Sequence, residues 1–456
     1  MKKGIFSIIA LLGLFSSTLA AQTTAPATPT IDAGDTAWMI VATAFVLLMS
    51  IPGLALFYGG LVRRKNVLSV FMQVFILVAV ISIEWVVLGY SNAFSSNSIE
   101  ALKPYIGGFD WAFLNNIKVS DVSPYFISHS QTLADGTTTG TVPHLIFIMF
   151  QGMFAVITPA LIIGAFAERI NFKGFLVFSI LWAVLIYNPV AHWVWSADGW
   201  LFKLGALDFA GGTVVHVNAG IAAIVTALML GKRRDYKGHA LPAHNITYVA
   251  IGAALLWVGW FGFNAGSGLA ADGLAANALM VTNLAAATAA LTWALLEWFI
   301  DKRPTTVGIC TGAVGGLVAI TPAAGFVGVP GALLIGVAVS LVCFTMVAYV
   351  KPKLGYDDSL DAFGVHGIGG ILGAILTGVL ATPAVQSAYS GAAFGNFHQL
   401  WVQIEAVGVT IIFSGIGTFI LFKITDLLIG VRATDKEESI GLDEAQHGET
   451  AYTNFD

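Results

Sequence analysis

Two stretches of this chain share one pattern: residues 208–216 read DFAGGTVVH, and residues 361–370 read DAFGVHGIGG. Each joins an acidic residue, Phe, Gly, Val and His at the start of a long apolar segment. One introduces the fifth such segment and the other the tenth. Five crossings separate them, an odd number, so the two halves run in opposite directions. Inverted repeats place substrate sites at their interface, near the bilayer midplane. We therefore expect His216 and His366 to converge, with chance similarity as the alternative because Gly and Val are common here.

The composition excludes most soluble classes of protein. Hydrophobic residues make up 57% of the 456 residues, charged residues only 10%, and the mean hydropathy is +0.82. Soluble domains carry about 25% charged residues, so a water-soluble enzyme and a disordered chain are both excluded. A net charge of −5, from 21 Lys and Arg against 26 Asp and Glu, argues against a nucleic-acid partner. The predicted fold class is an all-α polytopic membrane protein.

Apolar stretches near the length that a membrane helix needs recur along the chain. We expect about eleven transmembrane helices, arranged as two inverted five-helix repeats plus a long final helix, with Gly and Pro interrupting the eighth and tenth. The expected ranges are 37–62, 67–94, 143–166, 174–195, 211–230, 245–265, 277–300, 306–320, 328–350, 362–382 and 400–429.

Two signals in the sequence predict the same orientation. Lys2 and Lys3 precede a short apolar core and the small residues of 18–20, a pattern typical of a secretory signal peptide. The rival interpretation, an uncleaved first span, needs about 20 apolar residues. Lys and Arg also gather after odd-numbered spans, as at Arg63 to Lys65 and Lys232 to Arg234, and such residues favour the cytoplasmic side. We expect a multi-pass protein of the cell inner (cytoplasmic) membrane, with its N-terminus outside and its C-terminus in the cytoplasm.

This topology divides the chain into four expected parts. Residues 1–21 form the signal peptide, 22–36 an extracytoplasmic N-terminal linker, 37–430 the transmembrane domain and 431–456 a cytoplasmic C-terminal tail. The tail is polar and acidic, which is typical of a solvated, disordered end.

Histidines within spans are the first candidates for chemistry. Ionisable groups are costly in a membrane and often mark ion or proton paths, and a neutral imidazole can both donate and accept a hydrogen bond. His216 and His366 stand out because the repeat pairs them. A metal site is the rival, but two histidines without a third ligand nearby in sequence make a poor one. We expect no metal and no cofactor.

Other polar and aromatic residues allow two interpretations each. Asp208 precedes a helix start, where it could cap the helix or attract a cation. Trp195 belongs to a group of aromatic residues that could form an interfacial belt or a cage for a small ammonium-type ion. Ser267 follows Phe263 by about one helical turn, so its hydroxyl could accept a hydrogen bond from such an ion. Glu84 lies within the second span, and the sequence does not identify its partner.

Several long motifs resemble one known family. They occur in this order along the chain: Gln151-Gly-Met-Phe154, Ala167-Glu-Arg-Ile170, Asp208 to His216, Gly259-Trp-Phe-Gly-Phe-Asn-Ala-Gly-Ser267 and Phe363-Gly-Val-His-Gly367. Together they resemble the Amt/Rh ammonium transporters, on the bacterial Amt side, over nearly the whole expected mature chain. The tail stretches Gly441-Leu-Asp443 and His447-Gly-Glu-Thr-Ala-Tyr452 are also similar to that family, although Ser439-Ile440, just before Gly441, departs from its more charged pattern.

The resemblance implies a role for particular residues of this chain. Trp195, Phe154, Ser267 and Asp208 would recruit ammonium at an outer site. Phe154 and Phe263 would form a stacked gate, and Trp260 would form part of the pore wall. His216 and His366 would line the pore and relay a proton. The implied activity is ammonium transport with no catalytic residues: the cation is recruited and deprotonated, and ammonia is conducted.

The resemblance also implies an assembly and a partner. It predicts a homotrimer with a central pore in each protomer, and regulation by a PII-type protein at the cytoplasmic face. An ammonium sensor that signals through such a partner is the alternative, although the tail is short for a fused output domain. An intramembrane enzyme is not supported, because no nucleophile–base or zinc-binding motif is present. A carbon dioxide channel is a further alternative within the transport class.

Overall fold

The structure, a computed structural model, describes residues 29–133, 135–237 and 241–452. The expected signal peptide, residues 1–21, lies outside the described residues. Ten helical segments in the described ranges are long and apolar enough to cross a membrane, and a shorter apolar helix, Thr306–Ile320, makes an eleventh crossing candidate. The prediction of an all-helical, polytopic membrane protein is therefore confirmed, and Thr306–Ile320, the shortest of these crossing candidates, has the expected bounds.

Most spans are α-helices, several of them interrupted by a π-helical turn. The α-helices are α1 (Ala33–Leu48), α2 (Ala55–Leu61), α3 (Val67–Glu84), α4 (Tyr90–Phe94), α5 (His144–Phe166), α6 (Phe172–Trp182), α7 (Asn188–Trp195), α8 (Trp200–Leu204), α9 (Asn218–Leu230), α10 (Ile246–Gly266), α11 (Gly273–Asp301), α12 (Thr306–Ile320), α13 (Val329–Thr345), α14 (Lys351–Leu354), α15 (Ile368–Leu380), α16 (Phe397–Ile429) and α17 (Asp435–Ile440). The π-helical turns are η1 (Met49–Leu54), η3 (Trp85–Gly89), η5 (Ala183–Tyr187), η6 (Gly212–Val217), η7 (Met346–Val350), η8 (Phe363–Gly367) and η10 (Asp443–His447). Short 3₁₀ turns are η2 (Arg64–Asn66), η4 (Ala112–Leu114) and η9 (Ala392–Phe394).

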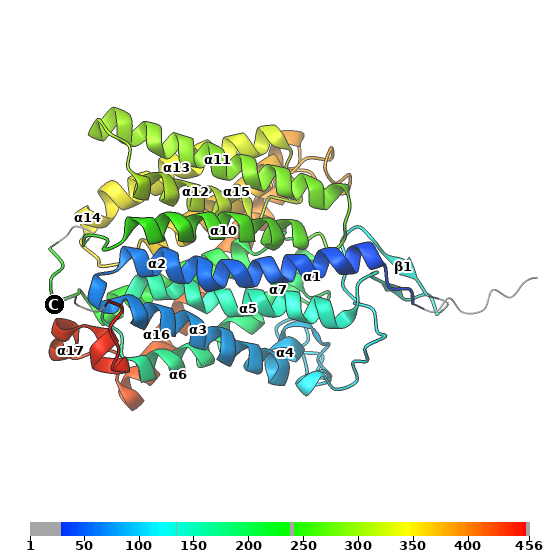
Figure 1. Cartoon of the computed structure of the whole chain (residues 1–456). Coiled ribbons are helices and arrows are strands. Elements are labelled where there is room, and N and C mark those ends of the chain that lie inside the picture. Colours follow the sequence, from blue (N-terminus) through cyan, green and yellow to red (C-terminus); the bar gives the residue numbers. More distant parts are fainter. Residues whose placement is uncertain (1–28, 134, 238–240, 453–456) are drawn as a thin grey trace, which may run out of the picture.

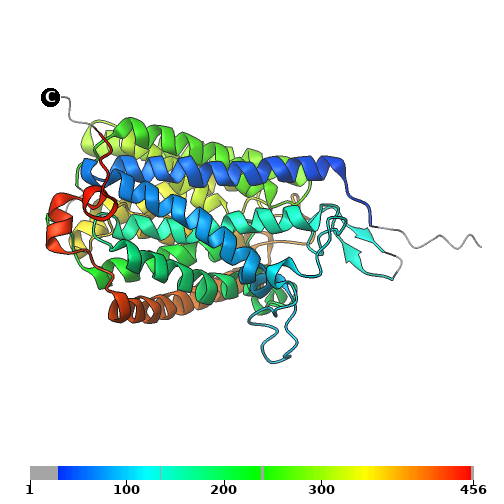
Figure 2. The same cartoon turned by 60° about the horizontal axis from the view of Figure 1, so that its bottom comes forward.

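The long helices lie side by side in a bundle, and the two ends of the bundle differ (Figure 1). At one end, α1 begins next to the long loop 95–142, which carries an antiparallel hairpin of β1 (Gln131–Thr132) and β2 (Thr138–Thr139). We call this end the loop face. At the other end, α14 and α17 lie beside the end of the described chain, and we call it the tail face. Figure 2 shows the same two ends from another side.

Contacts at the loop face fix the start of the first span. Asp32 caps α1 by accepting the backbone N–H of Asp35 at 2.8 Å, so the helix begins four residues before the expected position 37. Asp35 is buried and holds the loop 95–142: His129 Nδ1 lies 2.9 Å from its Oδ2, and the Thr141 hydroxyl donates to the same oxygen. Asp35 also accepts the N–H of Ala271, which ties the loop 267–272 to α1.

The two histidine helices cross at glycines. A Cβ added to Gly220 in α9 would lie 2.1 Å from the Cα of Gly367 in η8, and one added to Gly370 in α15 would lie 2.8 Å from the Cβ of His216. Small residues at such crossings let membrane helices approach closely. This close approach brings the two π-helical turns η6 and η8 into contact.

The two histidine helices run in opposite directions, as the sequence predicted. The segment η6–α9 starts just after Asp208, which lines a loop-face cavity, and Arg233, just beyond its end, bonds Asp357 near the tail face. The segment η8–α15 starts close after Asp357 and ends before Thr382, whose N–H donates to Phe326 of that loop-face cavity. The antiparallel arrangement places one histidine on each side of a shared axis.

The C-terminal tail corrects an expectation. Residues 431–452 are folded against the tail face, so the prediction of a disordered end is wrong for them. Asp443 accepts the backbone N–H of Ser69 at 2.7 Å, and the N–H of Leu442 donates to Asn66 at 2.8 Å. The Tyr452 hydroxyl lies 3.0 Å from Nε2 of His244. Composition alone missed this docking because the polar tail bonds to helix ends instead of burying an apolar stripe.

Candidate functional site

A cavity of about 460 Å³ opens at the loop face. It is lined by Trp195, Asp208 and Ser267, three of the four residues expected at the outer recruitment site. The Trp195 indole N–H donates to the backbone carbonyl of Asp208 at 2.9 Å, which fixes the ring at the mouth. The Ser267 hydroxyl donates to the carbonyl of Phe263 at 2.9 Å, so its oxygen keeps lone pairs with which it can accept a hydrogen bond from a bound cation.

Two phenyl rings lie beyond this loop-face cavity, which we call the vestibule. The Phe154 and Phe263 rings are stacked with centroids 4.1 Å apart and planes 23° apart, and both are buried. Phe154 also meets Trp195 edge-on at 5.7 Å, with planes 88° apart. Phe154, the fourth residue expected at the recruitment site, therefore joins the tryptophan at the mouth to the phenyl pair. An apolar pair in this position opposes the passage of an ion.

The paired histidines lie past the phenyl rings. The His216 and His366 rings are 5.4 Å apart between centroids and nearly parallel, at 18°. His216 also stacks on Trp260 at 5.4 Å, and the Trp260 N–H donates to the Thr321 hydroxyl at 2.8 Å, which holds this wall in place. The convergence predicted from the repeated sequence pattern is thus present, and Trp260 lines the same cavity as the two histidines.

The histidines line a narrow cavity with open hydrogen-bonding atoms. The centre of a water-sized molecule can occupy about 10 Å³ of this cavity. This is about the space that one water molecule requires. Both ring nitrogens of His216 and Nδ1 of His366 are buried and have no partner among the described residues. His366 and Phe57 also line a second cavity, of about 420 Å³, that includes Asp361 near the tail face. The arrangement is a vestibule, an apolar seal, a one-molecule cavity and a second vestibule.

Comparisons with known proteins identify the family of this chain. The model of the Ammonium Transporter Family matches residues 37–452. An ammonium transporter of Bacillus subtilis is 50% identical over 421 residues, which cover 92% of this chain and 98% of the relative. The chain belongs to the ammonium transporter family. Membership confirms the prediction of a transporter and not an enzyme.

Solved structures share the fold. The crystal structure of Saccharomyces cerevisiae Mep2 superposes with a TM-score of 0.81 at 36% identity, over 93% of this chain and 92% of that one. A structure described as a sensor Amt protein superposes with a TM-score of 0.80 at 28% identity, over 91% and 98% of the two chains. The chain is a multi-pass membrane protein with the Amt fold.

Asp208 acts as a helix brace in this family member. Its two carboxylate oxygens accept the backbone N–H groups of Gly211, Gly212, Thr213 and Val214 at 2.6–3.0 Å. Burial raises the pKa of Asp208, and the four N–H groups oppose that rise. The helix-capping interpretation is therefore present in the structure, and the carboxylate orients η6, which carries His216.

The second repeat has the same kind of brace, at a residue that the alignment of the two repeats did not identify. Asp358, which is fully buried, accepts the N–H groups of Ala362 and Phe363 at 3.1 and 2.8 Å. Asp358 precedes His366 by eight positions, the same spacing as from Asp208 to His216. The initial pairing of Asp361 with Asp208 is wrong, because Asp361 bonds Lys351 at 2.7 Å instead. Equal spacing to the histidine was the signal that could have found Asp358.

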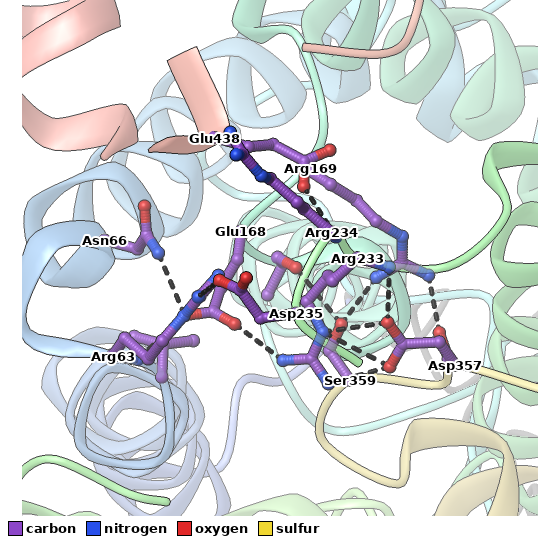
Figure 3. Close-up of polar contacts among 12 residues, drawn as sticks. Arg63, Asn66, Glu168, Arg169, Arg233, Arg234, Asp235, Asp357, Ser359 and Glu438 are labelled. Carbon is purple, nitrogen blue, oxygen red and sulfur yellow. Dashed lines mark hydrogen bonds and ion pairs between the residues drawn. The ribbon is translucent and has the colours of Figure 1, made fainter. Parts of the chain in front are cut away.

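A charge cluster holds the helix ends at the tail face (Figure 3). Glu168 bonds Arg233 at 2.6 Å and Arg63 at 2.9 Å, and Arg233 also bonds Asp357 at 2.7 Å. Burial disfavours ionised Glu168, but the two guanidiniums outweigh this effect and hold its pKa below the ordinary value. Arg169 donates to the Ser359 hydroxyl at 2.6 Å. The motif Ala167 to Ile170, whose role the sequence left open, therefore joins the two histidine helices at this end.

The tail attaches to the same region. Glu438, which is buried, bonds Arg432 at 2.5 Å and accepts the N–H of Arg234 at 3.1 Å. The Lys65 amine donates to the backbone carbonyls of Glu438 and Ser439. Ser439, which departs from the charged pattern of the family motif, contributes here through its backbone and not its side chain.

Proposed function

We propose that this chain admits ammonium as a cation only as far as the loop-face vestibule and conducts neutral ammonia beyond it. The observation that carries the proposal is the stacked pair of Phe154 and Phe263 between a polar vestibule and a one-molecule cavity lined by histidine nitrogens. A pore built for a hydrated ion would need polar groups where these rings lie.

Recruitment depends on three kinds of group. Aromatic faces attract a cation by about 2 kcal/mol each when desolvated, and Trp195 and Phe154 supply such faces at the mouth. The Ser267 oxygen accepts one ammonium N–H. The Asp208 carboxylate adds negative charge close to the vestibule that it lines.

Deprotonation follows from the free energy of desolvation. The ideal cost of moving an ammonium-sized ion into a low-dielectric interior is on the order of 20 kcal/mol, which the recruitment contacts offset only in part. Release of the proton removes most of this cost. Ammonia then passes along His216 and His366, which can donate to it or accept from it. The proton crosses separately by way of the same histidines, which makes uptake electrogenic.

Orientation and assembly complete the proposal. The loop face is placed outside the cell and the tail face in the cytoplasm, because Arg63, Lys65, Arg233 and Lys351 gather at the tail face and such residues favour the cytoplasm. The protomers form a homotrimer, and the docked tail offers a PII-type protein a surface beside the second vestibule.

Solid-supported-membrane electrophysiology on the purified, reconstituted protein tests the transport proposal. An ammonium concentration jump should give a current that an equal sodium jump does not give. Trp195→Leu should weaken selection for ammonium over its methylated analogues, whereas Trp298→Leu, at a side chain exposed on the bundle surface, should not. A protein that binds ammonium but gives no current would contradict electrogenic uptake. If ammonia uptake into proteoliposomes were absent as well, the result would contradict transport and support the sensor alternative.

A further inference from the structure

A second polar pair lies within the membrane region, away from the histidines. The π-helical turns η3 and η5 pack against each other. Glu84 is the last residue of α3, immediately before η3, and Asn188 is the first residue of α7, immediately after η5. The pair is thus built where two π-helical turns meet, as the histidine pair is, and π-helical turns are frequent at functional sites.

The contact between these two side chains is only half complete. Asn188 Nδ2 donates to Glu84 Oε1 at 2.9 Å. The other two oxygens, Glu84 Oε2 and Asn188 Oδ1, are buried and have no partner among the described residues. Gly89 leaves the space that the carboxyl group occupies, because a Cβ there would lie 2.7 Å from Oε2 and 2.8 Å from Oε1.

One proton satisfies both open oxygens. An ionised carboxylate and an amide oxygen only accept hydrogen bonds, whereas a protonated carboxyl has one O–H that donates. Leaving a buried acceptor unsatisfied costs about 1–3 kcal/mol, and an unpaired charge in a membrane costs more. We propose that Glu84 binds one exchangeable proton on Oε2 and donates it to Asn188 Oδ1, which closes a cyclic acid–amide pair with two hydrogen bonds.

The surroundings supply no countercharge that would keep Glu84 ionised. The ion pairs found in the described ranges do not include Glu84. Tyr187 on η5 is the neighbouring titratable group, and its buried hydroxyl, which also has no partner among the described residues, is an uncharged dipole that supplies no countercharge. The nearby elements α4, α5 and α7 carry Tyr90, His144 and His192, of which the first two bond each other and the third bonds backbone carbonyls.

The proton joins helices that matter for the pore. With it bound, α3 and α7 share two hydrogen bonds, and α7 ends at Trp195 of the vestibule. Without it, a carboxylate oxygen faces an amide oxygen that cannot donate to it. The site does not depend on whether the histidines carry protons. A test of this site can therefore fail while the transport proposal holds, and the reverse is also true.

Infrared spectroscopy of the full-length protein in lipid tests this site directly. We expect the wild type at neutral pH to show the carbonyl stretch of a protonated carboxylic acid that shifts in D₂O and is missing from Glu84→Gln. The Gln side chain can form the same two hydrogen bonds with Asn188, so this variant should fold normally. Equal carboxylic acid bands in the two proteins, or loss of a carboxylate band in the variant, would overturn the proposal.

Two further variants test the partner. In Asn188→Leu the acid has no amide, so its band should move toward the position of a free acid or disappear. A band unchanged in that variant would show that Asn188 is not the acceptor and would contradict the cyclic pair. Gly89→Ala places a methyl group against the carboxyl and should shift the same band, while Gly408→Ala, where an added Cβ meets no atom within 4 Å, should leave it unchanged.

Discussion

The histidine pair and the Glu84–Asn188 pair are built alike but differ in what lies between their polar atoms. His216 and His366 line a cavity with room for one small molecule, and their open nitrogens belong to that cavity. Glu84 and Asn188 bond each other directly. Open polar atoms beside a cavity suit a molecule that passes, whereas open atoms on two groups already in contact suit a bound proton. The same packing of π-helical turns thus supports two kinds of site.

The largest expected effect comes from breaking the histidine pair. His216→Ala removes the ring that touches both His366 and Trp260, and with it the proposed proton path. We expect the ammonium-induced current in proteoliposomes to be abolished while the protein still elutes as one oligomer. Currents of wild-type size would remove the proton-path role of His216, because charge would then cross the membrane by another route.

The braces of the histidine crossing should give the next largest effect. Asp208→Asn keeps the side chain's shape but replaces acceptors of four N–H groups with one acceptor and one donor. The amide nitrogen takes the place of an oxygen that accepts two of these N–H groups. Each hydrogen bond to a charged group contributes about 1.5–3 kcal/mol, so we expect the free energy of unfolding to fall by about 3–6 kcal/mol and the midpoint of thermal inactivation to fall with it. The Asp358 carboxylate accepts only two N–H groups, so Asp358→Asn should lower the stability less than Asp208→Asn. The reverse order would show that bond number does not decide the strength of the brace.

The glutamate crossing should respond more weakly and in a different pattern. Asn188→Leu leaves Glu84 without its partner and should destabilise the protein by about 1–3 kcal/mol. Glu84→Gln should lower the midpoint of thermal inactivation little, because both hydrogen bonds can persist. If Glu84→Gln were as destabilising as Asn188→Leu, the carboxyl would be ionised and the comparison between the two crossings would fail.

A titratable contact outside the membrane gives the smallest effect and a reference for the other two. The hydrogen bond to Asp35 raises the pKa of His129 above 6.5, with Asp272 and Asp32 adding to the rise. The stabilisation is therefore complete below pH 6.5 and is lost as pH rises through the higher folded-state pKa. Exposed pairs contribute up to about 1 kcal/mol, so hydrogen exchange of residues 123–142 should quicken modestly as pH rises through this window. His129→Gln should remove that dependence, and an unchanged dependence would assign it to another group.

Much of this site could be predicted because its signals are local in sequence. The spans follow from runs of apolar residues, and the two histidines follow from a repeated pattern around each of them. The partner of Glu84 could not be predicted, since Asn188 lies 104 positions away on a helix whose facing side depends on the turn η5. Asp358 was missed because the comparison aligned the nearest acidic residue instead of the one at equal spacing.

By itself, the sequence determined the membrane class, the family and the residues that line the vestibule and form the phenyl and histidine pairs, because burial in lipid requires long apolar segments and leaves polar residues conspicuous within them. Only the tertiary structure decided which carboxylate braces which helix, how the charge cluster joins the helix ends, and that the polar tail docks. Those features depend on hydrogen bonds between segments far apart in the chain, whose geometry exists only after the helices have packed.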